Sequence, residues 1–203
     1  MHLPKPFLSL FLFLLPHISH ADSPLTSTPF HEAFLDMKIV RYAKEKGVMD
    51  KKIAKCLLSK RKSVGLKAAV INALGWDIDG KKNAEIFLGF LTAKRGITAD
   101  NREWDALNAS DLMCMGYLMA MDNYFDCEAA EKVLFMAREK DPGSFTIAFM
   151  HSLVLAQVLF DSDWCLVWQA VNEVYVDKNL VREMHPPAIK IVMDYIELYK
   201  EEC

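Results

Sequence analysis

Residues that start and stop helices recur along the whole chain, and this punctuation constrains the fold more than any other feature. Thr28-Pro29 predicts the start of a helix that Gly47 ends, and Asp50 and Ser63 are typical N-caps of the next two helices. Between these signals, apolar residues follow the three- and four-residue spacing of a helix buried on one side. The pattern predicts about ten helices of roughly 8 to 17 residues.

One stretch, residues 145–160 (FTIAFMHSLVLAQVLF), is apolar on nearly all sides. It is shorter than the roughly 18 residues expected of a spanning helix, and it carries His151, Ser152 and Gln157. We therefore expect it to be the buried central helix of the core. The connections are short, so the predicted fold is all-α, either stacked antiparallel α-hairpins or a compact orthogonal helical bundle. We expect one domain over residues 28–203.

The first 21 residues have the pattern of a secretory signal peptide. Lys5 precedes the apolar run FLSLFLFLL, and Ser19-His20-Ala21 is typical of a cleavage site. We expect an extracytoplasmic protein, periplasmic or secreted, after cleavage near Ala21. The polar segment 22–27 is predicted to be disordered.

The charge balance argues against a nucleic-acid partner. The formal net charge is −3, and removal of residues 1–21, which contain one Lys and no acid, makes it −4. Nucleic-acid-binding domains are usually strongly basic. A local run of Lys and Arg at residues 51–62 is the exception, and we expect it to form a solvated face. No second apolar run is long enough to span a membrane.

The chain has five cysteines, and an odd number leaves at least one thiol free or paired between chains. Disulfides would suit an oxidising compartment, but reduced, buried cysteines remain an alternative. Cys114 and Cys127 are expected on adjacent antiparallel helices and are the candidate disulfide. Cys203 could tie down the last helix or bridge a dimer.

One segment, from Asp111 to Pro142, resembles a tetratricopeptide repeat. Ala130, Leu134 and Ala137, followed by Pro142, have the spacing of the second helix of that repeat, and Gly116 supplies the small residue of the first. The interval from Gly116 to Ala130 is about two residues longer than the consensus. The resemblance implies an α-hairpin stack whose concave face binds peptides or other proteins.

Candidate chemistry is sparse. Four methionines lie near Cys114 within residues 113–121, and sulfur ligands of this kind can bind Cu(I). Methionines two residues apart on a helix point to nearly opposite sides, so we expect no copper site. We expect no metal ligand, no catalytic residue and no cofactor. Glu103 and His151 are the residues on which an all-α extracytoplasmic hydrolase, acting on cell wall or lipid, would depend.

The preferred interpretation is an exported, non-enzymatic helical module that binds another protein or peptide. It would be a periplasmic scaffold or an immunity- or inhibitor-type protein. Such a module should present a contiguous exposed apolar or acidic patch. Trp164 and Trp168 are four residues apart on one helix face and are the candidate partner-binding aromatics, because Trp is frequent among interface hot spots.

Overall fold

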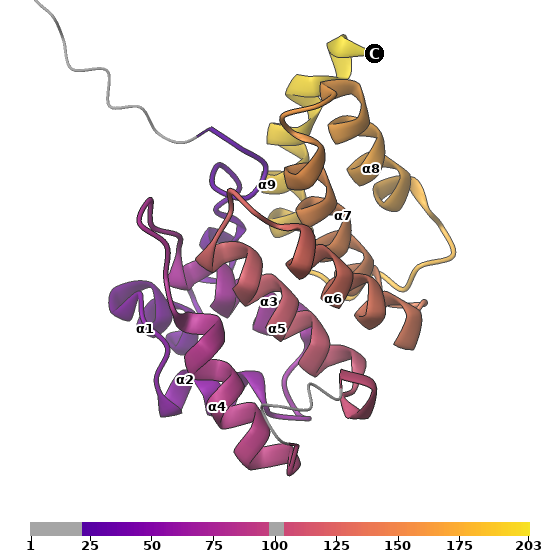
Figure 1. Cartoon of the computed structure of the whole chain (residues 1–203). Helices are drawn as coiled ribbons and strands as arrows, with labels where there is room; N and C mark the ends of the chain where they lie inside the picture. The colour runs from indigo at the N-terminus through magenta and orange to yellow at the C-terminus, as the bar shows by residue number, and fades with distance from the viewer. Residues whose placement is uncertain (1–21, 98–103) are drawn as a thin grey trace, which may run out of the picture.

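The computed structural model describes residues 22–97 and 104–203, and these residues form an all-α fold, as predicted (Figure 1). The predicted signal peptide lies outside the described residues. Within them the only β feature is an isolated bridge between Ser144 and Val181. The α-helices are α1 (Lys38–Lys46), α2 (Lys51–Leu57), α3 (Val64–Leu74), α4 (Asn83–Arg95), α5 (Ala109–Asp122), α6 (Glu128–Lys140), α7 (Phe145–Leu159), α8 (Trp164–Val176) and α9 (Pro186–Ile196). Among the described residues there are also 3-10 helices: η1 (Phe30–Phe34) precedes α1, η2 (Trp104–Ala106) lies between α4 and α5, and η3 (Glu197–Glu202) follows α9.

Several predicted helix boundaries are confirmed by the hydrogen bonds at the helix ends. Asp50 Oδ1 accepts the N–H of Ile53 at 2.9 Å, and Ser63 Oγ accepts the N–H of Leu66 at 3.3 Å. Gly47 ends α1 in the left-handed conformation, with φ of 61°. Such conformations favour glycine because it lacks a Cβ. Local sequence therefore determines where these helices begin and end.

The predicted continuous helix from Thr28 to Gly47 is wrong. The chain instead forms η1, makes a turn, and begins α1 at Lys38. The turn between η1 and α1 is closed by Met37 N–H, which donates to the Phe34 carbonyl at 2.9 Å. A tertiary contact from α3 holds the start of η1: Asn72 Oδ1 accepts the backbone N–H of His31, and Asn72 Nδ2 donates to the Thr28 carbonyl. Buried backbone groups must be paired, and here a side chain distant in sequence pairs two of them.

Helix α7 lies at the centre of the core, as its all-round apolar sequence predicts. Its N-terminal two-thirds is almost completely buried, and it packs against α3, α5, α6 and α8. In Figure 1, α1, α2 and α4 lie on one side of the molecule, α7 and α8 lie on the other, and α3 and α5 run between them. The helices on both sides of the molecule thus contribute to one hydrophobic core.

Helices α5 and α6 form the most extensive helix pair. Gly116 lies where they cross, and a Cβ atom there would lie 2.8 Å from Leu134 Cγ and 3.0 Å from the Ala130 carbonyl oxygen. The small residue is therefore required for this close approach. This hairpin is the segment that resembles a tetratricopeptide repeat, but a repeating array remains a prediction.

Segment 22–27 is folded, so the prediction of disorder is wrong. Ser27 N–H donates to the Ser23 carbonyl at 2.9 Å, which closes a turn. Leu25 is 1% exposed, and its N–H donates to Gln157 Oε1 on α7. A single apolar residue in a polar segment gives no periodic signal, which is why the sequence pattern missed this anchor.

Candidate functional site

Helix α2 is short, and its exposed face is basic. Ile53 and Leu57 point into the core, while Lys51 and Lys55 stay exposed. The Asp50 cap that fixes the start of α2 also accepts a hydrogen bond from Tyr42 Oη at 2.5 Å. The turn that follows α2, residues 58–63, adds further cations. Local capping therefore holds a dense set of positive charges in place.

Helix α4 packs beside α2 and contributes the second wall of the site. Phe87 and Leu91 are fully buried, whereas Phe90 is only half-buried. The last turn of α4 carries Lys94 and Arg95, and cations at a helix C-terminus are favoured by the helix dipole.

Together these elements form a concave surface that we call the basic groove, with a cavity volume of about 830 Å³. Its floor is apolar, and six of its lining side chains are Lys or Arg. No Asp or Glu is among its lining residues, which are Lys51, Ala54, Lys55, Leu58, Ser59, Lys60, Arg61, Phe90, Ala93, Lys94 and Arg95. A cleft lined by one sign of charge focuses the electrostatic potential and concentrates ligands of the opposite sign.

Arg95 is the one groove cation with a carboxylate partner among the described residues. Its Nε and Nη2 donate to Asp111 Oδ2 and Oδ1 at 2.6 and 2.8 Å, and the Asp111 side chain is 1% exposed. The bond to Asp111 raises the pKa of Arg95 above its ordinary value. Asn108 Nδ2 also donates to Asp111 Oδ2. This pair fastens the end of α4 to the start of α5 and so fixes the groove wall.

A smaller cavity of about 360 Å³ continues the groove past Leu58 and Lys60. It reaches Lys67, which is almost fully buried and donates from Nζ to Ser110 Oγ at 2.6 Å. Lys62 also lines it. Positive charge therefore extends beyond the main groove toward the N-terminal end of α5.

The sequence pattern identified the basic run that forms half of this site, but not the groove that it lines. The Lys and Arg side chains of residues 51–62 are exposed, as expected of a solvated face, and four of them also line the groove. The missing half is α4, more than 30 residues further along the chain. The distribution of charge along the sequence is the signal that points to the N-terminal part of the chain. Residues 22–97 hold 15 Lys and Arg against eight Asp and Glu, whereas residues 104–203 hold seven Lys and Arg against 17 Asp and Glu.

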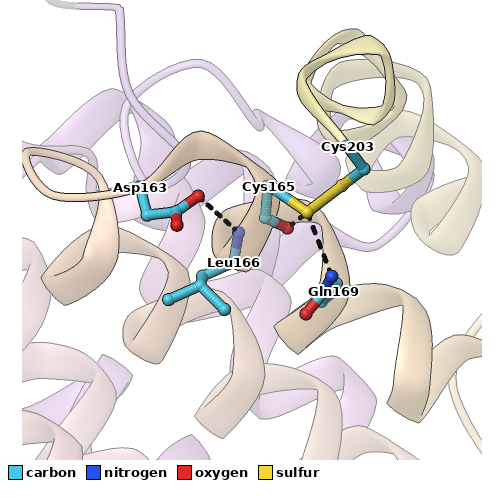
Figure 2. Close-up of a disulfide and its surroundings, with 5 residues drawn as sticks. All are labelled: Asp163, Cys165, Leu166, Gln169 and Cys203. Atoms are coloured by element: carbon cyan, nitrogen blue, oxygen red, sulfur yellow. Dashed lines mark hydrogen bonds between the residues drawn. A yellow bond between two sulfur atoms is a disulfide. The ribbon is translucent and has the colours of Figure 1, made fainter.

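The predicted disulfide between Cys114 and Cys127 is wrong. The disulfide joins Cys165 at the start of α8 to Cys203, and Gln169 Nε2 donates to Cys165 Sγ at 3.0 Å (Figure 2). Cys114 and Cys127 do share the α5–α6 hairpin, but at different levels. Because Gly116 faces Leu134, Cys114 lies opposite a position about nine residues beyond Cys127, which is roughly 13 Å along a helix. The expectation that Cys203 could tie down the last helix is confirmed, because the bond links the end of η3, which continues α9, to α8.

The three remaining cysteines, Cys56, Cys114 and Cys127, are buried thiols. Burial raises the pKa of both Cys114 and Cys127 to about 12. The thiolate is the nucleophilic form, so neither side chain is activated at neutral pH. The methionines around Cys114 pack into the core on α5. These sulfur atoms contribute packing.

The two candidate aromatics differ in exposure. Trp164 is 49% exposed, donates from Nε1 to the Phe160 carbonyl at 3.0 Å, and stacks on the Phe160 ring. Trp168 is half-buried and packs against the core. Trp164 is therefore the more exposed of the two, and a role in partner binding remains a prediction for both.

Of the two residues named for the hydrolase alternative, only His151 lies in the part of the chain that the structure describes. His151 is buried, its Nε2 lies 2.8 Å from Glu131 Oε1, and it lines neither the basic groove nor the smaller cavity beside it. Glu103 lies outside the described residues. In residues 22–97 and 104–203, no three His, Cys, Asp or Glu side chains cluster in a way that could hold a metal ion.

Comparisons with protein-family models, with curated proteins and with solved structures found no match to this chain. A search of the described helices found none that is both long and apolar enough to cross a membrane. Functional inference for this chain therefore starts from the geometry of the basic groove.

Proposed function

We propose that this chain is an exported, non-enzymatic helical module that binds an acidic surface of another protein in the basic groove. The observation that carries the proposal is the lining of that groove: six cations surround an apolar floor, and no carboxylate is among the lining residues. Polar and charged ligands are usually recognised in such a setting by a few placed charges around an apolar surface.

The groove offers two kinds of binding energy. Lys51, Lys55, Lys60, Arg61 and Lys94 have no carboxylate partner among the described side chains. Carboxylates of a ligand would relieve their mutual repulsion and speed association by electrostatic steering. The floor would add burial of apolar surface, at about 25 cal/mol per Å². An amphipathic helix with an acidic rim combines both features.

A protein suits the groove better than a nucleic acid. Proteins that bind single strands present exposed aromatic rings on which bases stack, but the only ring on this floor, Phe90, is half-buried. The described residues after the groove, 104–203, carry a net charge of −10 and would repel a long polyanion. A local acidic surface avoids that cost.

Export is part of the proposal. It is supported by the signal-peptide pattern of residues 1–21 and by the Cys165–Cys203 disulfide, a bond typical of oxidising compartments. A scaffold and an inhibitor would both use such a groove. No feature of the described residues favours the hydrolase alternative.

The test uses the chain beginning at Asp22 as bait in the extracytoplasmic fraction of the native organism. The wild-type bait is compared with Lys55→Glu/Arg61→Glu/Lys94→Glu, and with the matched control Lys38→Glu/Lys178→Glu/Lys200→Glu, whose charge changes lie on exposed surface outside the groove. We expect a stoichiometric partner that the wild-type and control baits capture equally and the groove variant loses at least tenfold. Equal capture by all three baits would contradict the proposal.

A further inference from the structure

A second surface has the opposite charge to the basic groove. Two neighbouring cavities share Phe160 and Asp161, and neither is lined by a Lys or Arg. We call their combined rim the acidic-aromatic surface. Its carboxylates are Asp22, Asp126, Glu128, Asp161, Asp163 and Glu202, and its rings are Tyr124, Phe125, Phe160 and Trp164. It fits the acidic patch expected from the sequence.

Two of the rings on this surface are exposed to solvent. Phe125 is 72% exposed and Trp164 is 49% exposed. Aromatic rings exposed inside a charged rim are typical of protein interaction sites. The surface thus offers apolar anchors as well as negative charge.

Several contacts hold this surface in a fixed shape. The rings of Trp164, Phe160 and Tyr199 pack as a three-membered cluster, in which Trp164 lies 6.3 Å from Phe160 and 6.0 Å from Tyr199, centroid to centroid, and Phe160 lies 5.9 Å from Tyr199. The disulfide ties η3 to the start of α8 beside it (Figure 2). Tyr195 Oη donates to Asp22 Oδ1 at 2.7 Å, so the beginning of the described chain is attached as well. A pre-organised surface loses little entropy on binding.

We infer that copies of this chain associate head to tail, the acidic-aromatic surface of one copy docking in the basic groove of the next. This inference rests on the proposed function, because it assigns a second copy of the chain as an acidic protein occupant of the same groove. The two surfaces are complementary in charge: five groove cations without a carboxylate partner among the described side chains would face a surface lined by six carboxylates. The exposed rings of one surface match the apolar floor of the other.

The placement of the two surfaces makes the contact heterologous. Helices α2 and α4, which form the groove, lie at the opposite end of the molecule from the C-terminus and the adjoining α8 (Figure 1). A copy can therefore dock at each end. Such head-to-tail contacts produce rings where the rotation closes and open chains where it does not.

The experiment is sedimentation velocity on the chain beginning at Asp22, over a range of protein concentrations and salt. We expect the average sedimentation coefficient of the wild type to rise with concentration at low salt. It should return to the monomer value at about 1 M salt, where the Debye length is about 3 Å. Charge-driven association depends on salt in this way.

Two neutralised variants each remove one surface. The groove variant is Lys55→Gln/Arg61→Gln/Lys94→Gln, and the end variant is Asp126→Asn/Glu128→Gln/Asp161→Asn. No side-chain hydrogen bond or ion pair in the described structure depends on these six residues, so both variants should fold. Each is expected to be monomeric alone, and an equimolar mixture should form a dimer that grows no further, because one intact surface of each kind remains.

Two results would overturn the inference. One is a wild type that stays monomeric at low salt up to high concentration, while an acidic amphipathic peptide still binds the groove; the proposed function would then stand without self-association. The other is groove-dependent flotation with vesicles rich in phosphatidylglycerol by a monomeric chain, which would identify a lipid surface as the occupant. If neither the peptide nor a second copy binds in a groove-dependent way, both proposals fail.

Discussion

The two ends of this molecule carry opposite charges and are built in different ways. The basic groove is assembled from two helices brought together across the sequence and fixed by the buried Arg95–Asp111 pair. The acidic-aromatic surface is held by stacked rings and by the Cys165–Cys203 disulfide. The small net charge of −3 conceals this segregation. The contrast teaches that a near-neutral total says little about how charge is arranged on the surface.

The strongest test of this contrast is removal of the ion pair at the basic end. We expect Arg95→Met to lower the free energy of unfolding by about 3 to 5 kcal/mol, because it leaves the buried Asp111 carboxylate without its cation. Urea unfolding followed by circular dichroism measures this. The double variant Arg95→Met/Asp111→Leu should recover most of the loss. A loss below about 1 kcal/mol for Arg95→Met would show that the pair does not fix the groove wall.

The corresponding test at the acidic end is removal of the disulfide. Cys165→Ser/Cys203→Ser should lower the free energy of unfolding by about 3 to 4 kcal/mol, since the bond closes a loop of 38 residues in the unfolded chain. A reductant should destabilise the wild type by a similar amount and leave the double variant unchanged. Equal stability of the wild type with and without reductant would argue against a bond between these residues.

A third pair of substitutions compares the tight α5–α6 crossing with the exposed surface of α4 at the basic end. Gly116→Ala should cost about 1 to 3 kcal/mol, because the added Cβ would meet Leu134 and the Ala130 backbone. The matched control is Gly89→Ala on α4, where a Cβ meets no atom within 4 Å. It should stabilise by about 0.5 to 1 kcal/mol through helix propensity. Thermal unfolding of both variants checks the expected difference in sign.

The smallest expected effect concerns pH and the basic half of the chain. Burial lowers the pKa of His31, which bonds through Nδ1 to Asn72. The unfolded chain therefore takes up this proton at higher pH than the folded chain does. The contribution of His31 to stability is present above pH of about 6.5 and is lost as the pH falls toward its lowered folded pKa.

His31→Gln removes this titration and tests its direction. Between pH 7 and 5 the stability of the wild type should fall more steeply than that of the variant, with a difference of at most about 1.4 kcal/mol per pH unit. Urea unfolding at several pH values measures both slopes. Parallel curves would show that His31 does not titrate differently in the two states.

The sequence pattern predicted the local features of this fold well. Asp50 and Ser63 were identified as caps, and the all-round apolar stretch at 145–160 as the central helix. These features depend on residues within one turn of each other. The helical spacing of residues 28–47 gave no sign of the break in the first predicted helix, and the start of η1 is held by Asn72, about 40 residues away in sequence.

The candidate site follows the same rule. Residues 51–62 stand out as a basic run, but the groove exists only because α4 packs beside α2. The disulfide depends on η3 folding back onto α8, and spacing alone does not indicate that contact. Trp164 and Trp168 have the same helical face, and only their surroundings decide that one is exposed and the other half-buried.

The most direct test of the central claim is fluorescence anisotropy with a labelled amphipathic helical peptide that carries Glu on one face and Leu on the other. We expect the peptide to bind the wild type saturably, with an affinity that falls steeply as salt is raised. Binding should be lost in Lys55→Glu/Arg61→Glu/Lys94→Glu and retained in Lys38→Glu/Lys178→Glu/Lys200→Glu. Equal affinity for both variants, or tighter binding of a single-stranded oligonucleotide than of the peptide, would contradict the central claim.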